Sequence, residues 1–203
     1  MSAQFEEQGG AATMDPTPLG RWLTSRFISA LSRPARLQRK RAKFERQRIK
    51  AGAPHCIEYF YQIDDGYSHL AAQTLAALID RYDIELRVHL VEGPQGKNVA
   101  EPELLAALSQ YDAFHVAPAY GLDFPDPHVS SPASFKQQAI AILAAQDADD
   151  CVDCLVAVSR AFWANDGQAM NALADRYGLA SDNETVARIA SGKRRRATLK
   201  HYS

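Results

Sequence analysis

The segment DDGYSH, Asp64 to His69, contains the residue types that could do chemistry. It interrupts an apolar run, and the residues after it follow a different period, which predicts a turn between a strand and a helix. Adjacent carboxylates at such a turn have three alternative roles: capping the helix, general acid or base catalysis, and binding a cationic group. We favour capping by Asp64 and Asp65, because Asp is a preferred N-cap residue and its charge suits a helix N-terminus. We expect His69 to be exposed on that helix.

A second candidate is the Cys-x-x-Cys motif formed by Cys151 and Cys154, which is predicted to open a helix. It follows another predicted helix, whereas a thioredoxin-type motif follows a strand. Three aspartates surround it and disfavour a thiolate: Asp149, Asp150 and Asp153. The two thiols share a helical stripe with three apolar residues: Leu155, Val158 and Phe162. We therefore expect both thiols in the core as small hydrophobes, with a redox pair and a zinc site as alternatives.

The elements around DDGYSH form a recognisable unit. Residues 57–63 are rich in Ile, Tyr and Phe, with apolar residues on both faces, which predicts a buried central strand. Apolar residues recur at helical spacing over 67–82, on a face that runs from Tyr67 to Tyr82. Residues 84–91 alternate strictly and predict a half-exposed strand. Together they predict a parallel βαβ unit within an α/β fold.

The rest of the body is predicted to be helical. Five segments have helix-compatible spacing: 101–111, 134–146, 151–163, 167–177 and 183–191. No third strand is predicted before the chain ends at Ser203.

The strand, DDGYSHLA and the helix resemble the opening of the DsbA-like branch of the thioredoxin superfamily, in particular 2-hydroxychromene-2-carboxylate isomerases and kappa-class glutathione transferases. GLDFPDP, residues 121–127, is similar to the turn before that family's inserted helical domain, and AVSRAFWAND, residues 157–166, is similar to one of its helices. The resemblance covers about residues 57–190. It implies a thioredoxin-like domain over 55–203 with a helical insertion at about 100–191, preceded by an arm and linker over 1–54.

The resemblance also implies roles for the turn. Asp65 takes the nucleophile position, Gly66 replaces the usual proline, and Ser68 takes the second reactive position. The flanking residues implied to bind substrate are Asp64, Gly66, Tyr67 and His69. Neither the thiol nor the first-position serine of the family is present, and the Asp65 carboxylate would repel a glutathione thiolate.

Two function classes follow from the resemblance. The first is a non-redox module that binds a small molecule or peptide in the groove that corresponds to the family's active site. The alternative is an active thiol oxidoreductase, or a glutathione-dependent isomerase or transferase, with glutathione as the implied cofactor. No metal site is expected.

The resemblance further implies a cis-proline loop and two more strands, but the last proline is Pro132. We therefore expect those strands to come from a longer chain or from another copy. The strand at 57–63 would otherwise leave Tyr59, Phe60 and Tyr61 open to solvent, which predicts self-association.

Composition and charge describe a globular body with a basic arm. The 203-residue chain is 46% hydrophobic and 23% charged, without an apolar run long enough for a membrane helix. Residues 1–50 hold 11 Lys/Arg and 4 Asp/Glu, whereas residues 51–203 hold 12 and 20. Leu19, Trp22 and Phe27 mark an amphipathic helix, broken or kinked at Pro34. We favour protein contact for this arm over a membrane surface or nucleic acid.

Localisation is inferred from the cysteines and the N-terminus. Three cysteines are too few for a disulfide framework, and the N-terminus lacks a secretory apolar segment, so we expect a cytoplasmic protein.

Overall fold

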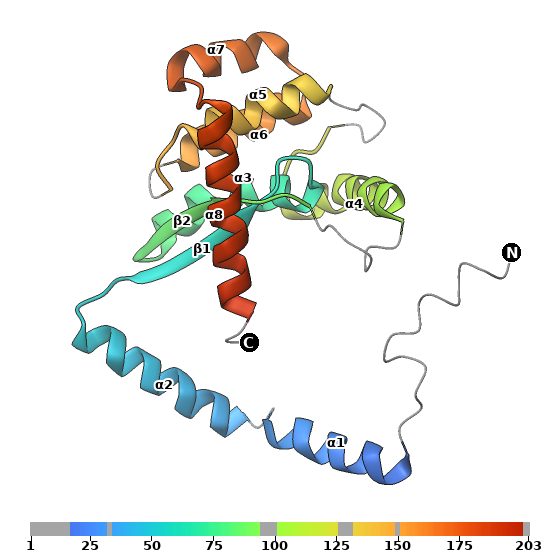
Figure 1. Ribbon diagram of the computed structural model, residues 1–203, viewed down its shortest axis with the longest axis vertical. Helices are drawn as coiled ribbons and strands as arrows, with labels where there is room; N and C mark the ends of the chain where they lie inside the picture. The colour runs from blue at the N-terminus through green and yellow to red at the C-terminus, as the bar shows by residue number, and fades with distance from the viewer. Residues whose placement is uncertain (1–16, 32–33, 94–100, 126–131, 149–150, 201–203) are drawn as a thin grey trace, which may run out of the picture. The chain divides into compact units, whose positions relative to one another are not determined.

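The computed structural model describes residues 17–31, 34–93, 101–125, 132–148 and 151–200 (Figure 1). It divides into two compact units, Met1–Ala53 and Pro54–Ser203, which we call the arm and the body. The described arm consists of helices α1 (Pro18–Leu31) and α2 (Pro34–Lys50). Pro34 begins α2, a position where its missing N–H removes no intrahelical hydrogen bond.

The body opens with the predicted βαβ unit. Strand β1 (His55–Tyr61) leads through the DDGYSH turn into helix α3 (Gly66–Arg81), and strand β2 (Ile84–Leu90) follows. The strands pair in parallel, in a register that runs from His55 opposite Ile84 to Tyr61 opposite Leu90. The α/β class and the parallel pairing are confirmed. Within the described residues the sheet has two strands, and no peptide bond is cis.

The remaining elements are helical. They are α4 (Pro102–Val116), the 3-10 turn η2 (Ala117–Tyr120), α5 (Ala133–Ala144), α6 (Val152–Trp163), α7 (Gly167–Tyr177) and α8 (Asp182–Lys200). Helices α5, α6 and α7 pack on one another, and α3 packs against α6 and α4. None of the described helices has both the length and the apolar character needed to cross a bilayer.

The two faces of the sheet have different partners. One face carries the buried residues Tyr61, Leu86, Val88 and Leu90, which join α6 in the main core. The other face carries Glu58, which accepts hydrogen bonds from Arg195 of helix α8. Figure 1 shows α8 crossing both strands. The crossing is close, because a Cβ on Gly192 of α8 would clash with the Leu90 carbonyl oxygen.

The helices correct the expectation that Tyr59, Phe60 and Tyr61 lie open. Tyr61 is 1% exposed, because its ring packs in the core and its hydroxyl reaches Ser159 of α6. Tyr59 is half-buried against the same core, and Phe60 stacks on His89 at 5.0 Å between ring centroids. The sequence pattern showed strand residues but could not show which distant helices cover them.

Helix α3 is also rotated relative to its predicted face. Leu70 and Leu75 are buried as expected, but Tyr67 and Tyr82 are exposed. The cause is that α3 packs between α6 and α4, so its buried side includes Gly66 and Ala72.

Helix α8 begins one residue before its predicted start and continues well past 191.

Candidate functional site at the start of helix α3

Asp65 is the N-cap of helix α3. Its extended backbone (φ −101°, ψ 121°) directs the carboxylate over the first turn, where Oδ2 accepts from the Ser68 N–H and from the Ser68 hydroxyl, both at 2.8 Å. Oδ1 accepts from the Ser109 hydroxyl of α4 at 3.0 Å. Three donors therefore engage both oxygens, and the carboxylate joins two helices.

Gly66 follows the cap because α4 lies too close for a side chain. A Cβ at this position would be 2.9 Å from the Ala113 Cβ and 3.1 Å from the Ser109 carbonyl oxygen. The ring of Phe124 would lie 3.3 Å away. Close packing at this point therefore requires glycine, in the position where the resemblance implies proline.

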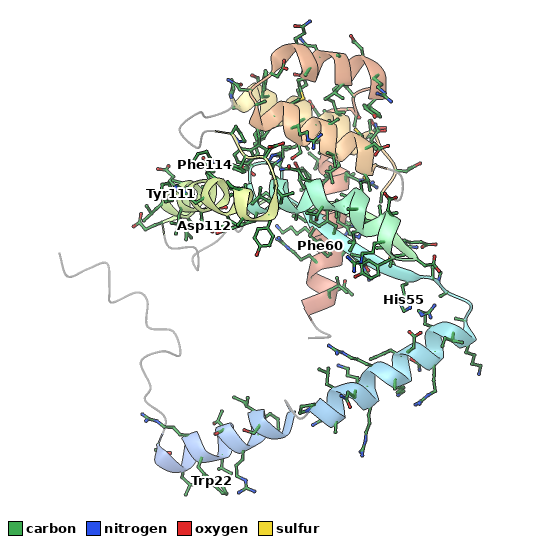
Figure 2. The ribbon with its side chains drawn as sticks, turned by 180° about the vertical axis from the view of Figure 1, so that it is seen from behind. Trp22, His55, Phe60, Tyr111, Asp112 and Phe114 are labelled. Atoms are coloured by element: carbon green, nitrogen blue, oxygen red, sulfur yellow. The ribbon has the colours of Figure 1, made fainter. Side chains whose placement is uncertain are left out.

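Two tyrosines flank the cap. Tyr67 is half exposed, and its hydroxyl donates to Asp112 Oδ2 of α4 at 2.5 Å; Figure 2 labels Asp112. This hydrogen bond raises the pKa of Tyr67. Tyr59 donates to the Ser68 carbonyl oxygen at 2.6 Å. Burial raises the pKa of Tyr59, with a smaller contribution from the charge of Asp65. Both phenols therefore act as neutral donors near pH 7.

Asp64 faces away from this network. Its carboxylate accepts from Lys136 Nζ of α5 at 2.6 Å and from Gln62 Nε2 at 3.0 Å. Burial opposes ionisation, but the hydrogen bonds from Lys136 and Gln62 outweigh it and hold the pKa of Asp64 below its usual range. The ion pair is only half-buried, and it keeps Asp64 charged near pH 7.

Asp64 and Lys136 form part of the wall of a cleft at the carboxyl ends of β1 and β2, closed by α5 and α8. The cleft has a largely apolar lining: Tyr61, Ile63, Leu90, Ile140, Leu143 and Ile189. Glu92 adds a second carboxylate. In open α/β sheets, ligands bind outside the carboxyl ends of the strands.

His69 is 2% exposed, so the expectation of an exposed histidine was wrong. Its Nδ1 lies 2.7 Å from the Ser159 hydroxyl, and Nε2 lies 3.1 Å from Gln73 Nε2. The Gln73 amide is oriented by Asp123, whose N–H donates to Oε1 and whose carbonyl accepts from Nε2. Gln73 therefore donates to His69 Nε2, which places the imidazole proton on Nδ1.

The His69 network extends into the core. The Tyr61 hydroxyl donates to Ser159 Oγ at 2.9 Å, so this oxygen accepts from both Tyr61 and His69. Burial lowers the pKa of His69 to about 4, and the imidazole is neutral near pH 7. Trp163 packs nearby at 5.8 Å between ring centroids, and its Nε1 finds no hydrogen-bond partner within the described chain. His69 thus links α3 to α6 inside the protein.

Cys151 and Cys154 lie in the main core as expected, at 4% and 2% exposure, and neither forms a disulfide within the described residues. Burial, with a smaller contribution from the neighbouring Cys151, raises the pKa of Cys154 to about 12. The remaining cysteine, Cys56, is exposed on β1. Within the described ranges, no group of three His, Cys, Asp or Glu residues could hold a metal ion.

Sequence reasoning missed the partners of the turn. They lie far along the chain: Ser109, Asp112, Lys136 and Ser159. One signal was available on α4, where Ser109 and Asp112 stand one turn apart in an otherwise mainly apolar helix. Of the GLDFPDP segment, residues 126 and 127 lie outside the described residues.

Comparison with known proteins finds little. No family model matches the chain, and no curated protein matches it. One solved structure to which the chain is similar is a 2-hydroxychromene-2-carboxylate isomerase, at 16% identity and a TM-score of 0.43. That match covers 66% of this chain and 75% of the other.

Proposed function

We propose that the body is a thioredoxin-like binding module without redox activity, which takes a small molecule or peptide beside the N-terminus of α3. The observation that carries this proposal is the state of Asp65. Its two carboxylate oxygens are engaged by Ser68 and Ser109, so the side chain holds α3 and α4 together. A general base needs a lone pair directed at its substrate, and a redox turn needs a thiol.

The cleft beside Asp64 supplies the binding surface for this module. Its apolar lining suits an apolar group, and the Asp64–Lys136 ion pair offers polar contacts at the wall. Beside this cleft, the Asp65 carboxylate at the start of α3 adds a negative charge that accepts from Ser68 and Ser109 and has no cation among its hydrogen-bond partners in the described chain. At the start of α3 this charge disfavours a thiolate or carboxylate group of a ligand and favours a hydrogen-bond donor or a cationic group.

Calorimetry with reduced glutathione tests this repulsion by Asp65. We expect weak or undetectable binding to the unmodified chain. Asp65→Ser should strengthen binding severalfold, since removal of one like-charge contact is worth on the order of 1 kcal/mol. Serine is also an effective N-cap, so the helix start should survive the change.

Asp166→Ser is the matched control. Asp166 caps α7 through the Ala169 N–H in the same manner, but it belongs to another helix start. This variant should leave glutathione binding unchanged. Tight binding by the unmodified chain that Asp65→Ser weakens would contradict the proposed repulsion by Asp65.

A further inference from the structure

Helix α1 carries an exposed apolar face. The exposed fractions are 72% for Leu19, 56% for Trp22, 53% for Leu23 and 65% for Phe27, and Figure 2 labels Trp22 on this helix. At 100° per residue these side chains fall within an arc of roughly 140°. Neither apolar cluster of the molecule includes a described residue of the arm.

Arg26 lies within the same arc. Its guanidinium carbon sits 5.0 Å from the centroid of the Trp22 ring, a cation–π arrangement. A long arginine stem can lie along an apolar surface while its charge reaches polar groups above it. Helix α1 contains no Asp or Glu, so this face is apolar and cationic together.

Helix α2 adds a cationic face. Six cations recur along it at i, i+3, i+4, i+7, i+10 and i+14: Arg36, Arg39, Lys40, Lys43, Arg46 and Lys50. They occupy an arc of roughly 120°. The single acid of α2, Glu45, is paired with Arg48 at 2.6 Å. Among the residues that the structure describes, none of the six has an ion-pair partner.

We propose that the arm binds the surface of an anionic lipid bilayer, with the apolar face of α1 in the interface and the cationic face of α2 against the head groups. A short apolar face and a basic segment each give weak attachment, but together they supply the two signals that stable peripheral binding needs. Residues 51–203 hold more acids than bases, 20 against 12, so the same surface repels the body. The charge asymmetry therefore directs contact to the arm.

This partner replaces the protein contact that the sequence alone favoured. A nucleic acid would use the cations of α2, but it would leave Trp22 and Phe27 in water. An anionic bilayer can bury the apolar face of α1 in its interface and bind the cations of α2 through its head groups.

Vesicle sedimentation with the full chain tests the proposal. We expect binding to phosphatidylcholine vesicles that contain about one third phosphatidylglycerol, and little binding to pure phosphatidylcholine. Raising the salt from about 0.1 M to about 0.5 M should weaken it, because the head-group charge is screened. Phe27→Ser should lower the partition coefficient about tenfold, since one large apolar side chain leaves the interface.

Ile28→Ser is the matched control. Ile28 is the next residue and is 55% exposed, but it points to the opposite side of α1. The Ile28→Ser variant should bind the anionic vesicles as the unmodified chain does. On α2, Lys43→Gln should weaken binding severalfold, and Arg41→Gln, which lies off the cationic face, should weaken it less. All four variants should keep the thermal melt of the unmodified chain, because these side chains lie outside both cores.

Three results would overturn the proposal. The first is no binding to the anionic vesicles. The second is an equal loss of vesicle binding in Phe27→Ser and Ile28→Ser, which would show that the apolar face of α1 does not contribute to binding. The third is tight binding of a labelled oligonucleotide that depends on Lys43 while the vesicles stay unbound, which would identify nucleic acid as the partner.

Discussion

Helices α3 and α6 both begin with residues that could react, but the side chains at the two helix starts have different surroundings. At α3 the chain arrives from strand β1, and the Asp65 carboxylate caps the helix and reaches α4. At α6 Cys151 makes no side-chain capping bond, and both thiols are buried in the core. A helix N-terminus lowers a thiol pKa only where water or charge supports the thiolate, and here burial has the larger effect.

The comparison also shows how each start differs from a turn that carries a reactive thiol pair. The α3 turn has the position after a strand but no thiol. The α6 start has the thiols but no accessible position. The two requirements of a reactive pair are thus met at different places in the molecule.

The largest expected effect concerns His69, which ties α3 to α6. Its pKa is about 4 in the folded state against 6.5 for the free group, so the unfolded chain binds the extra proton between these values. The contribution of neutral His69 to the free energy of unfolding is fully present above about pH 6.5. It declines as the pH falls toward 4, by about 3 kcal/mol in total. His69→Gln should flatten this pH dependence of the free energy of unfolding, measured by urea denaturation.

His115→Gln is the control for this prediction. His115 is exposed on α4, so the variant should keep the pH dependence of the unmodified chain. If the free energy of unfolding of His69→Gln kept the same slope against pH, the buried imidazole would not be the source of the pH dependence.

A smaller effect is expected at the glycine after each capping aspartate. Gly66→Ala should destabilise the protein by about 2 kcal/mol, because the new Cβ would press on Ala113 and the α4 backbone. Gly167 follows the Asp166 cap of α7, where a Cβ would meet only the Phe135 ring, at 3.2 Å. Since a side chain can move aside, Gly167→Ala should cost less than half as much. Equal costs in urea unfolding would contradict the close contact between α3 and α4.

The smallest effect concerns the cap itself. Asp65→Ala should lower the free energy of unfolding by about 1 kcal/mol, because the Ser68 N–H and the Ser109 hydroxyl lose their acceptor. Asp65→Ser should cost less, since serine caps well. Asp166→Ala provides the matched loss at α7. A neutral Asp65→Ala beside a costly Asp166→Ala would rule out capping as the role of Asp65.

Much of the fold was predictable because it rests on local patterns. The alternation from Ile84 to Leu90 indicated the buried side of β2, and the stripe from Cys151 to Phe162 indicated the buried side of α6. Asp65 as a cap also follows from its own position in the chain. These features depend on residues within one or two turns of each other.

The rest depended on contacts between distant segments. The burial of His69 needs Ser159, which is 90 residues away, and the second oxygen of Asp65 needs Ser109, which is 44 residues away. The need for glycine at position 66 arises from α4, and the cover over Glu58 arises from α8. No periodicity within one element contains this information.

Insulin reduction in the presence of dithiothreitol detects a reactive thiol at either helix start, so it tests the claim that the chain has no thiol redox activity. We expect the full chain to give the dithiothreitol background rate and no more. Turnover above that background, abolished by Cys151→Ser, would show that the α6 thiols reach substrate and would contradict the claim.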